Sequence, residues 1–222
     1  MNILKPQKLI RENLISMDLK DTLKNILQEE KIVNTLVNQN NLSENYDVEN
    51  YDVEIYDIEF ETCMFDTVNL SNIKLDNNTF RDVKFVNCNF ANTSFSNTTF
   101  IRCEFTNCKL TGCNFSESRL YNVAILDSNA NYINLSMASI ERVLFQNTLL
   151  RNSYFQETKV KDIYFESSDL TQAQFFKTSL KNVDLSTSKI EGIAISVEDI
   201  KGAVIDEFQA PYLLYLLGVK IK

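Results

Sequence analysis

The sequence predicts an all-β solenoid, a prism of short extended segments that wind around one core, and three observations support this prediction. From Ile55 to Ile195, every fifth residue is apolar: 28 of these 29 positions hold Leu, Phe, Ile or Val, and Ala130 is the exception. Two residues before each of them, 28 of 29 positions hold a small or β-branched residue, with Asn78 as the exception. The three other positions of each unit are mostly polar.

A period of five fits neither the 3.6-residue period of a helix nor the strict alternation of a long strand. Each unit is therefore expected to be a short extended piece that ends at a corner, and its two inward residues form one wall of the prism. Thirteen of the fifteen phenylalanines and all five cysteines fall on the two inward series. The core is therefore expected to contain a ladder of stacked aromatic rings.

The units resemble the A(D/N)LXX repeat of the pentapeptide-repeat family, as in the segment NCNFANTSFSNTTF (residues 87–100). The similarity covers about two-thirds of the chain without a register break. It implies a right-handed quadrilateral β-helix with four units per coil, in which residues twenty apart stack. Residues 46–195 would then form about seven coils.

Both ends of a solenoid need caps, because an open coil exposes unpaired backbone groups and apolar side chains. Residues 1–45 are expected to form the N-terminal cap, with a short helix at residues 18–30 that Asp18 can cap. Four apolar residues share one stripe of this helix: Leu19, Leu23, Ile26 and Leu27. In the segment 31–52, apolar residues suggest an irregular first coil, whereas NQNNLSEN (38–45) suggests a loop.

Residues 196–222 are expected to form the C-terminal cap. Ser196 can cap a short helical turn that Gly202 ends, and the segment AVID can then continue a wall. In the segment EFQAPYLLYLLG that follows, apolar residues are distributed around the whole circumference of any helix that it forms. Pro211 is compatible with such a helix only if it lies in the first turn.

A helix that is apolar all round has to be buried on more than one side. One face can cover the last coil, and the face left over predicts a homodimer made through this end, with the strand VKIK (219–222) able to cross over. Qnr-like relatives have similar ends and pair in this way; the alternative is a lone cap folded back on itself. The predicted interface residues are Phe208, Tyr212, Leu213, Leu214, Tyr215, Leu216, Leu217, Val219 and Ile221.

The composition disfavours an enzyme. The chain contains no histidine, and its four glycines stand too far apart for a phosphate-binding loop. The series Cys103, Cys108 and Cys113 puts thiols on successive walls, which is typical of core residues, so no catalytic, metal or cofactor site is predicted. The odd number of cysteines and the absence of signal-peptide and membrane-span patterns predict reduced thiols and a cytoplasmic protein. Cys88 and Cys108, twenty apart, are expected to stack.

Charge is distributed unevenly. The net charge of −8 and pI near 4.7 disfavour direct nucleic-acid binding. Nine acids and no base lie between residues 44 and 66, whereas residues 67–195 hold twelve acids and thirteen bases and are close to neutral. We name the nine acids the acidic collar: Glu44, Asp47, Glu49, Asp52, Glu54, Asp57, Glu59, Glu61 and Asp66.

Two functions follow as expectations. The similarity to the Qnr and MfpA type of pentapeptide-repeat protein implies a DNA mimic that binds DNA gyrase or topoisomerase IV and modulates quinolone sensitivity. The near-neutral middle counts against mimicry, because a duplex is negative along its whole length. The alternative is a scaffold for another protein, which would use the acidic collar or the tyrosines Tyr46, Tyr51 and Tyr56 beside it. The collar could also serve solubility and protect an open end from aggregation.

Overall fold

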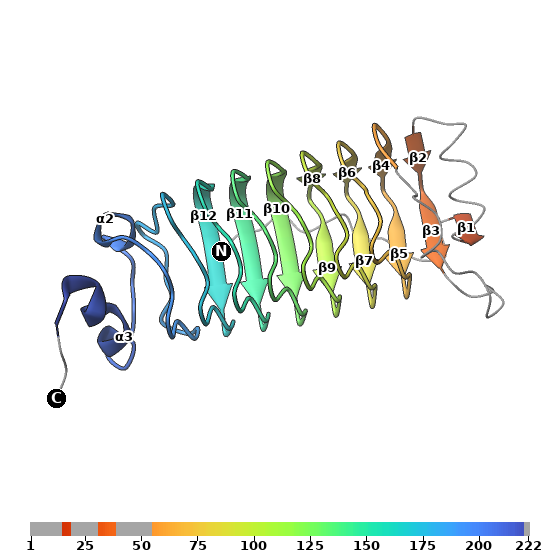
Figure 1. Ribbon diagram of the computed structural model, residues 1–222. Coiled ribbons are helices and arrows are strands. Elements are labelled where there is room, and N and C mark those ends of the chain that lie inside the picture. Colours follow the sequence, from red (N-terminus) through yellow and green to blue (C-terminus); the bar gives the residue numbers. More distant parts are fainter. Residues whose placement is uncertain (1–14, 19–30, 39–54, 220–222) are drawn as a thin grey trace.

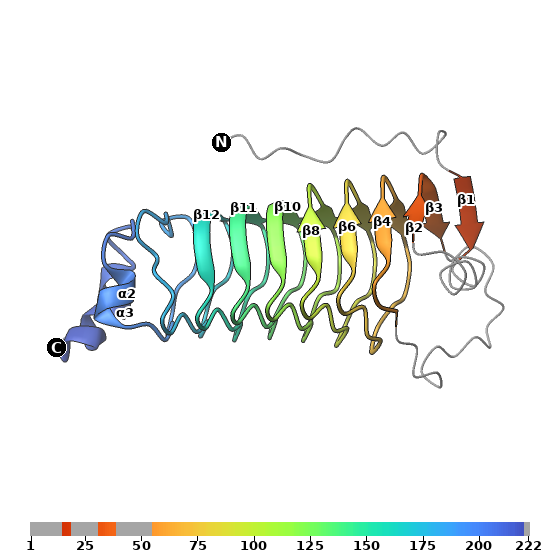
Figure 2. The ribbon, with the colours of Figure 1, turned by 90° about the horizontal axis from the view of Figure 1, so that it is seen from above.

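The computed structural model describes residues 15–18, 31–38 and 55–219, which form a parallel β-solenoid (Figure 1). Successive coils lie side by side along a rod, with β1 to β3 at one end and α2 and α3 at the other (Figure 2). The strands are β1 (Ile15–Asp18), β2 (Lys31–Val33), β3 (Thr35–Asn38), β4 (Glu59–Glu61), β5 (Met64–Asp66), β6 (Thr79–Arg81), β7 (Lys84–Val86), β8 (Thr99–Ile101), β9 (Glu104–Thr106), β10 (Arg119–Leu126), β11 (Ser139–Gln146) and β12 (Lys159–Glu166).

Strand pairing follows a twenty-residue register, as the repeat predicts. Phe60 pairs with Phe80, which pairs with Phe100, and every pairing between the described strands is parallel. Four five-residue units therefore complete one coil. We name the walls A, B, C and D by their central residues in one coil, Phe60, Phe65, Leu70 and Leu75, and each wall includes the corner that follows it. Walls A and B carry the strands over six coils, from β4 to β12, whereas walls C and D pair through single bridges.

The corners depend on left-handed backbone conformations. From residue 57 to residue 192, every fifth residue has a positive φ, with Thr187 as the one exception, and sixteen of these corners are Asn, Asp or Gly. Those residues tolerate this conformation best, because their side chains are short and polar or absent. At Asn92 a β-turn closes through the hydrogen bond from the Thr93 amide to the Phe90 carbonyl (2.9 Å).

Corner side chains also stack from coil to coil. Amide side chains donate to the residue twenty positions earlier: Asn92 to Asn72 (3.1 Å), Asn97 to Asn77 (2.7 Å) and Asn107 to Asn87 (2.7 Å). Each of these Asn corners thus adds a side-chain hydrogen bond to the backbone ladder, which is one structural cause of the abundance of Asn outside the core.

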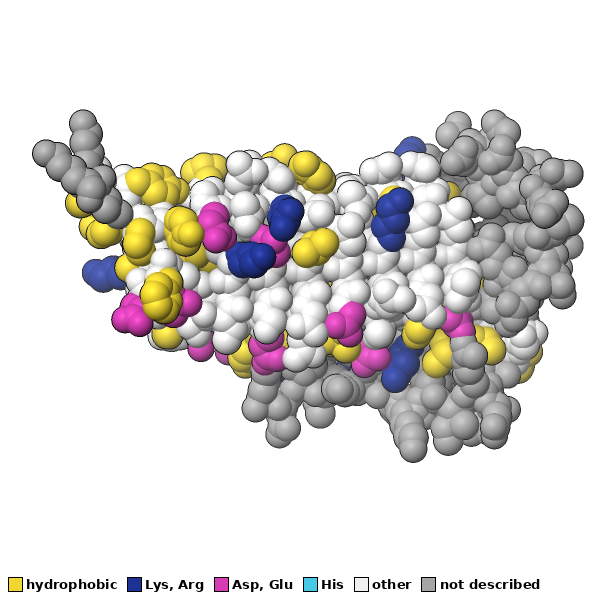
Figure 3. Space-filling view, turned by 90° about the horizontal axis from the view of Figure 1, so that it is seen from below, with side chains coloured by type: hydrophobic (Ala, Val, Ile, Leu, Met, Phe, Trp, Pro, Cys, Tyr) yellow, Lys and Arg dark blue, Asp and Glu magenta, His cyan; other side chains and the backbone are white. Residues whose placement is uncertain are grey.

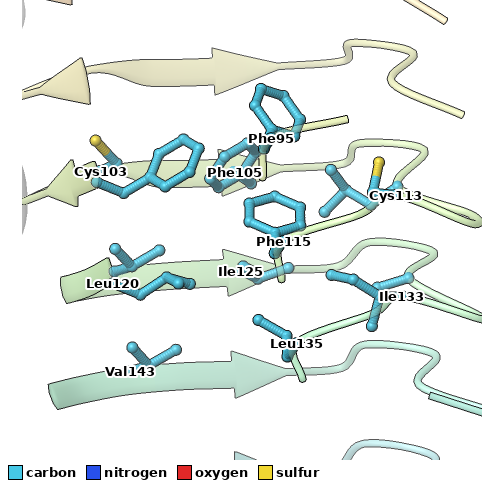
Figure 4. Close-up of a cluster of buried hydrophobic side chains, with 14 of the residues drawn as sticks. Phe95, Cys103, Phe105, Cys113, Phe115, Leu120, Ile125, Ile133, Leu135 and Val143 are labelled. Carbon is cyan, nitrogen blue, oxygen red and sulfur yellow. The ribbon is translucent and has the colours of Figure 1, made fainter. Parts of the chain in front are cut away.

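The core is a ladder of aromatic rings, as expected from the sequence. Phe60, Phe80 and Phe100 stack with ring centroids 4.8 and 5.1 Å apart, and Phe85 and Phe105 stack at 4.5 Å. Rings of adjacent walls meet edge to face, and aliphatic side chains such as those of Leu120, Ile125 and Leu135 continue the core below them (Figure 4). Thirteen phenylalanines therefore fill one continuous interior.

The residues of the second inward series, two positions before each central residue, also form hydrogen bonds. Their hydroxyl and thiol groups donate to carbonyl oxygens of the preceding coil: Thr98 to Leu75 (2.9 Å), Cys103 to Phe80 (3.3 Å) and Thr148 to Ile125 (3.0 Å). Buried polar groups are costly unless they are paired. Thr, Ser and Cys can therefore replace Val and Ile at these positions.

At the N-terminal end, β2 and β3 extend walls A and B by one more coil. They pair with β4 and β5 at an offset of 28 residues instead of 20, and β1 pairs with β3 at an offset of 20. The predicted helix at residues 18–30 lies outside the described residues except for Asp18, the last residue of β1.

At the C-terminal end, Ser196 caps the short helix α2 (Val197–Ile200) by accepting a hydrogen bond from the Asp199 amide (3.0 Å), as expected. Val204 then bridges to Asp184 and continues wall B. Helix α3 (Ala210–Leu214), with Pro211 in its first turn, runs into the 3-10 helix η3 (Tyr215–Leu217).

Candidate functional site

The charges of the solenoid are sorted by wall. Between residues 67 and 195, wall A holds seven of the thirteen cations and three of the twelve anions, whereas wall B holds one cation and four anions. The cations of wall A are Arg81, Arg102, Arg119, Arg142, Lys159, Lys161 and Lys181, and its anions are Asp82, Glu141 and Asp162. The anions of wall B are Glu104, Asp127, Glu166 and Asp184, and its cation is Lys84. The near-neutral middle is therefore a basic wall beside an acidic wall.

Three cations of wall A are exposed and form no ion pair among the described residues: Arg119, Lys159 and Lys181. Arg119 and Lys159 lie in one column, because both pair in register with Ser139. At about 4.8 Å between adjacent strands, they stand roughly 10 Å apart on one flat face. These three charges are available to a partner.

The other cations of wall A are held by neighbours. Arg102 binds Asp82 through two hydrogen bonds, Nε to Oδ1 (2.7 Å) and Nη2 to Oδ2 (2.5 Å). Lys161 and Arg142 both donate to Glu141 Oε1, at 3.0 and 2.7 Å. The hydrogen bond from Lys161 lowers the pKa of the Glu141 carboxyl, and Arg142 adds to this effect. Glu141 therefore stays ionised and keeps both cations in place.

The guanidinium of Arg142 also lies over the ring of Tyr121, 4.3 Å from its centroid, and forms a cation–π contact. The ring is 38% exposed. Wall A therefore offers an aromatic surface among its charges, a combination that is common in binding surfaces for proteins.

The acids of wall B lie beside mostly neutral groups. Asn147 Nδ2 donates to Asp127 Oδ1 (2.9 Å), and Gln146 Nε2 donates to Glu166 Oε2 (2.8 Å). The hydrogen bonds from Ser186 lower the pKa of the Asp184 carboxyl. Lys84 lies 3.8 Å from Glu104. Wall B therefore presents a negative stripe along the rod.

The acidic collar lies partly outside the described residues, because Glu44, Asp47, Glu49, Asp52 and Glu54 belong to the segment 39–54. The structure brings two cations to the described part. Lys31 Nζ lies 2.6 Å from Glu61 Oε2 and 3.5 Å from Glu59 Oε2, and Arg81 Nε lies 3.6 Å from Glu59 Oε1. These partners are remote in sequence, so a count of residues 44–66 misses them.

The other described residues of this end differ in exposure. Asp66 is buried, whereas Tyr56 is 60% exposed; Tyr46 and Tyr51 lie outside the described residues. The sequence placed the three tyrosines together as one candidate surface. The structure describes one of them, and its ring is accessible.

Hydrophobic side chains gather at the C-terminal end of the rod, and much of the rest of the same face is uncharged (Figure 3). Of the predicted interface, Leu213 and Leu216 pack against the core of their own chain, whereas Phe208 and Leu217 are 78% and 62% exposed. Tyr212, Tyr215 and Val219 are exposed, Leu214 is half-buried, and Ile221 lies outside the described residues.

Gln209 is not among the residues singled out from the sequence, and it is buried at 5% exposure. Its Nε2 donates to the carbonyl oxygens of Leu185 (2.8 Å) and Ser188 (2.5 Å). Its backbone amide and side-chain oxygen exchange hydrogen bonds with Asp206, as in a capping box. Gln209 therefore satisfies the open carbonyls of the last coil. The spacing D-x-x-Q before an apolar run is the signal that could have identified it.

All five thiols are free and buried. Burial raises the pKa of Cys63 to about 11 and that of Cys103 to about 12. The hydrogen bond with Cys88, together with burial, raises the pKa of Cys108. These two thiols interact, as their spacing of twenty predicts.

Within residues 15–18, 31–38 and 55–219, no group of three or more Cys, Asp or Glu side chains is placed to hold a metal ion. None of the helices in this part of the chain has the length and apolar character needed to cross a bilayer.

Residues 98–175 match a family model described as a pentapeptide repeat region. No protein with a curated description matches the chain. Among solved structures, a trypsin-treated form of QnrB1, a plasmid-mediated fluoroquinolone resistance protein, is 19% identical, with 87% of this chain and 90% of that one covered and a TM-score of 0.41. Full-length QnrB1 is 16% identical, with coverage of 92% and 100% and a TM-score of 0.34.

HetL, a pentapeptide repeat protein involved in heterocyst differentiation regulation in the cyanobacterium Nostoc sp. strain PCC 7120, is 11% identical, with coverage of 86% and 98% and a TM-score of 0.31. At these scores the fold assignment rests on the strand register of the chain itself. Residues 98–175 therefore form a pentapeptide repeat region, and the five-residue period and the stacking of residues twenty apart continue the same fold on both sides of it.

Proposed function

We propose that the protein is a non-catalytic scaffold that binds the acidic surface of a protein partner through wall A. The observation that carries this proposal is the sorting of charge, which leaves Arg119, Lys159 and Lys181 exposed and unpaired within the described residues. Complementary charge steers association and fixes orientation. Paired strands present Arg119 and Lys159 in fixed positions on one flat face.

The buried thiols support a non-catalytic role. A thiol attacks as its thiolate, and a raised pKa keeps Cys63 and Cys103 protonated at neutral pH. The chain has no histidine to serve as a general base. The exposed groups of the described rod are therefore suited to binding.

Site-specific photo-crosslinking in cells tests the use of wall A. A photoreactive residue at Ser139, exposed between Arg119 and Lys159, should capture a partner, and the same residue at Gln172, a corner after wall C, is the matched control. The triple variant Arg119→Glu, Lys159→Glu, Lys181→Glu should abolish the adduct at Ser139. An adduct of equal yield in this variant would overturn the proposal.

A second candidate is the binding of a type II topoisomerase by mimicry of DNA. The negative stripe of wall B, together with the net charge of −8, favours it, whereas the basic wall beside the stripe has no counterpart on a duplex. A gyrase supercoiling assay with and without a fluoroquinolone tests it. Protection or inhibition at micromolar protein that is lost on Asp127→Lys and Asp184→Lys would establish the stripe as the contact, and no effect at any concentration would exclude gyrase.

We also propose a homodimer through the C-terminal end, where Phe208 and Leu217 are exposed beside Tyr212 and Tyr215. An exposed apolar group of this size is costly on a monomer. Light scattering coupled to size-exclusion chromatography should give twice the monomer mass, and Phe208→Glu should shift the protein to the monomer. A monomer mass for the unaltered protein at micromolar concentration would refute the dimer.

A further inference from the structure

The backbone ladder of walls A and B is interrupted between β12 and the next coil, although the chain continues in the same five-residue register (Figure 1). In earlier coils the corner amides of wall A donate to the next coil, each at 2.9 Å: Thr62 to Arg81, Asp82 to Ile101 and Arg102 to Tyr121. The Asp162 amide makes no such bond, and β12 pairs with β11 alone. Residues 159–166 therefore present an unpaired strand edge in the side of the rod, within its described part.

Two threonine side chains hold the coils at either end of this edge. Thr178 Oγ1 accepts a hydrogen bond from the Thr158 amide (3.0 Å), and Thr187 Oγ1 accepts one from the Ser167 amide (3.2 Å). On walls C and D the same two coils remain paired through their backbones. The opening is thus bounded on all sides.

A cleft of about 690 Å³ lies at this opening, between β12 and residues 179–187. Val160 in its lining is half-buried, whereas Leu120 and Ile140 of the same column are each 1% exposed. Ile163 and Phe165 remain buried at 3% and 2%. The cleft therefore has apolar room at wall A and a nearly closed floor at wall B.

The rims of the cleft carry opposite charges at its two halves. Lys161, Lys181 and Asp162 line the half on wall A, with Lys159 beside them, and Glu166 and Asp184 line the half on wall B, so three cations outnumber one anion on wall A. The cleft is therefore positive at one end and negative at the other.

We propose that this cleft binds an extended peptide segment of a partner protein, which adds to the edge of β12 as a strand. An unpaired edge offers alternating N–H and C=O groups, and an extended peptide is the ligand that satisfies them. Every described pairing in the solenoid is parallel, so the peptide runs parallel to β12. The site shares Lys159 and Lys181 with the docking surface proposed for wall A, whereas Arg119 belongs to that docking surface alone.

The register gives the chemistry of the peptide. Its first and third residues lie between Lys159 and Ser179 and between Lys161 and Lys181, where acids fit, and its second points inward beside Val160. Its fourth takes the corner at Asp162, where Asn or Gly adopts the positive φ.

The second half of the peptide follows the same rule. Its fifth and seventh residues point inward over Ile163 and Phe165, where small side chains fit. Its sixth and eighth lie outside near Asp184 and Glu166, where bases fit. The octapeptide DVDNAKAK meets each requirement.

Fluorescence anisotropy with labelled DVDNAKAK and the full chain tests the proposal. We expect saturable binding, and a loss of affinity of about tenfold in the variant Lys159→Glu, Lys181→Glu, because two attractive contacts become repulsive. The matched variant Arg119→Glu should bind the peptide unchanged and so separates this site from the docking surface of wall A. Equal affinity for the charge-exchanged peptide KVKNADAD would overturn the proposal.

Two further measurements isolate the strand pairing. In the earlier coils, outward residues donate back to the preceding coil, as Arg119 N does to Thr98 O (2.9 Å) and Ala124 N does to Cys103 O (3.0 Å). A peptide N-methylated at its four outward residues keeps its side chains but loses the donors that face β12, and it should not bind; full binding would overturn the added-strand geometry. Hydrogen exchange of the free protein should be faster in β12 than in β11 and should slow when DVDNAKAK is added. If the amides of β12 are protected from exchange at all protein concentrations without the peptide, the chain itself fills the edge. If their protection rises with protein concentration, a second copy of the chain occupies the cleft. Either result overturns the proposal.

Discussion

Replacement of Phe105 tests whether the aromatic ladder stabilises the rod. The ring is fully buried and stacks on Phe85 at 4.5 Å, and the rings of Phe100 and Phe115 lie at 5.8 and 6.2 Å. Phe105→Ala removes this side chain from a core that cannot collapse around it, because paired strands fix the walls. The expected loss is about 3–5 kcal/mol in the free energy of unfolding.

Phe105→Leu separates packing from ring contacts. Leu fills much of the volume and still packs on Ile125, its pairing partner in the next coil, so the expected loss falls to about 1–2 kcal/mol, mostly from the aromatic pairs. Phe176→Ala, on the outer face and 46% exposed, is the matched control with an expected change within about 0.5 kcal/mol.

Urea unfolding followed by circular dichroism measures these losses, and hydrogen exchange shows where the coils open, because stacked repeats need not unfold in one step. A loss below about 1 kcal/mol for Phe105→Ala, or an equal loss for Phe176→Ala, would refute the claim that the buried rings stabilise the rod.

Three other predictions follow from the same structure. Met137 occupies a left-handed corner with φ of 60°, so Met137→Asn should stabilise the protein by about 0.5–1 kcal/mol in thermal unfolding, and a lower melting temperature would contradict this. Burial raises the pKa of Cys103 to about 12 from an ordinary value near 9; the unfolded chain thus loses this proton first, and stability falls above pH 9 by up to about 1.4 kcal/mol per pH unit. Cys103→Val should reduce that slope in urea titrations between pH 8 and pH 10.5, and an unchanged slope would count against it. Gln209→Ala leaves the carbonyls of Leu185 and Ser188 unsatisfied, which should cost about 1–3 kcal/mol and speed amide exchange in the last coil; unaltered exchange there would assign the cap to other residues.

The sequence predicts the solenoid well because its signal is local and repeated. The inward residues recur every five positions, so each coil specifies the next, and the pairing of Phe60 with Phe80 follows from the spacing alone. The turn at Ser196 and the position of Pro211 also follow from local chemistry.

The sorting of charge was missed because it appears only when residues are grouped by twenty. A count of the charges in residues 67–195 adds the four walls together, and the total is nearly neutral. The pairs of Lys31 with Glu59 and Glu61 were missed for a related reason, since the pairing offset there is 28.

The break after β12 has no signal in the pentads. Leu180, Val183 and Leu185 keep the inward pattern and stay buried. The difference from the earlier coils lies in the hydrogen bond of the Ser167 amide. This amide donates to the hydroxyl of Thr187 and not to a backbone carbonyl of the next coil. Threonine occurs at the corners 62 and 67 without this effect, so residue type alone does not predict it.

The twenty-residue register also governs how such a chain can change length over evolution. Loss of five residues before Lys159 would carry every later residue back by one wall and would move the unpaired cations off the face of Arg119. Loss or duplication of twenty would leave each later residue on its wall. Homologues of this protein should therefore differ in length by whole coils. A partner that binds one wall would tolerate a longer rod, but it would not tolerate a change that moves its contact residues to another wall.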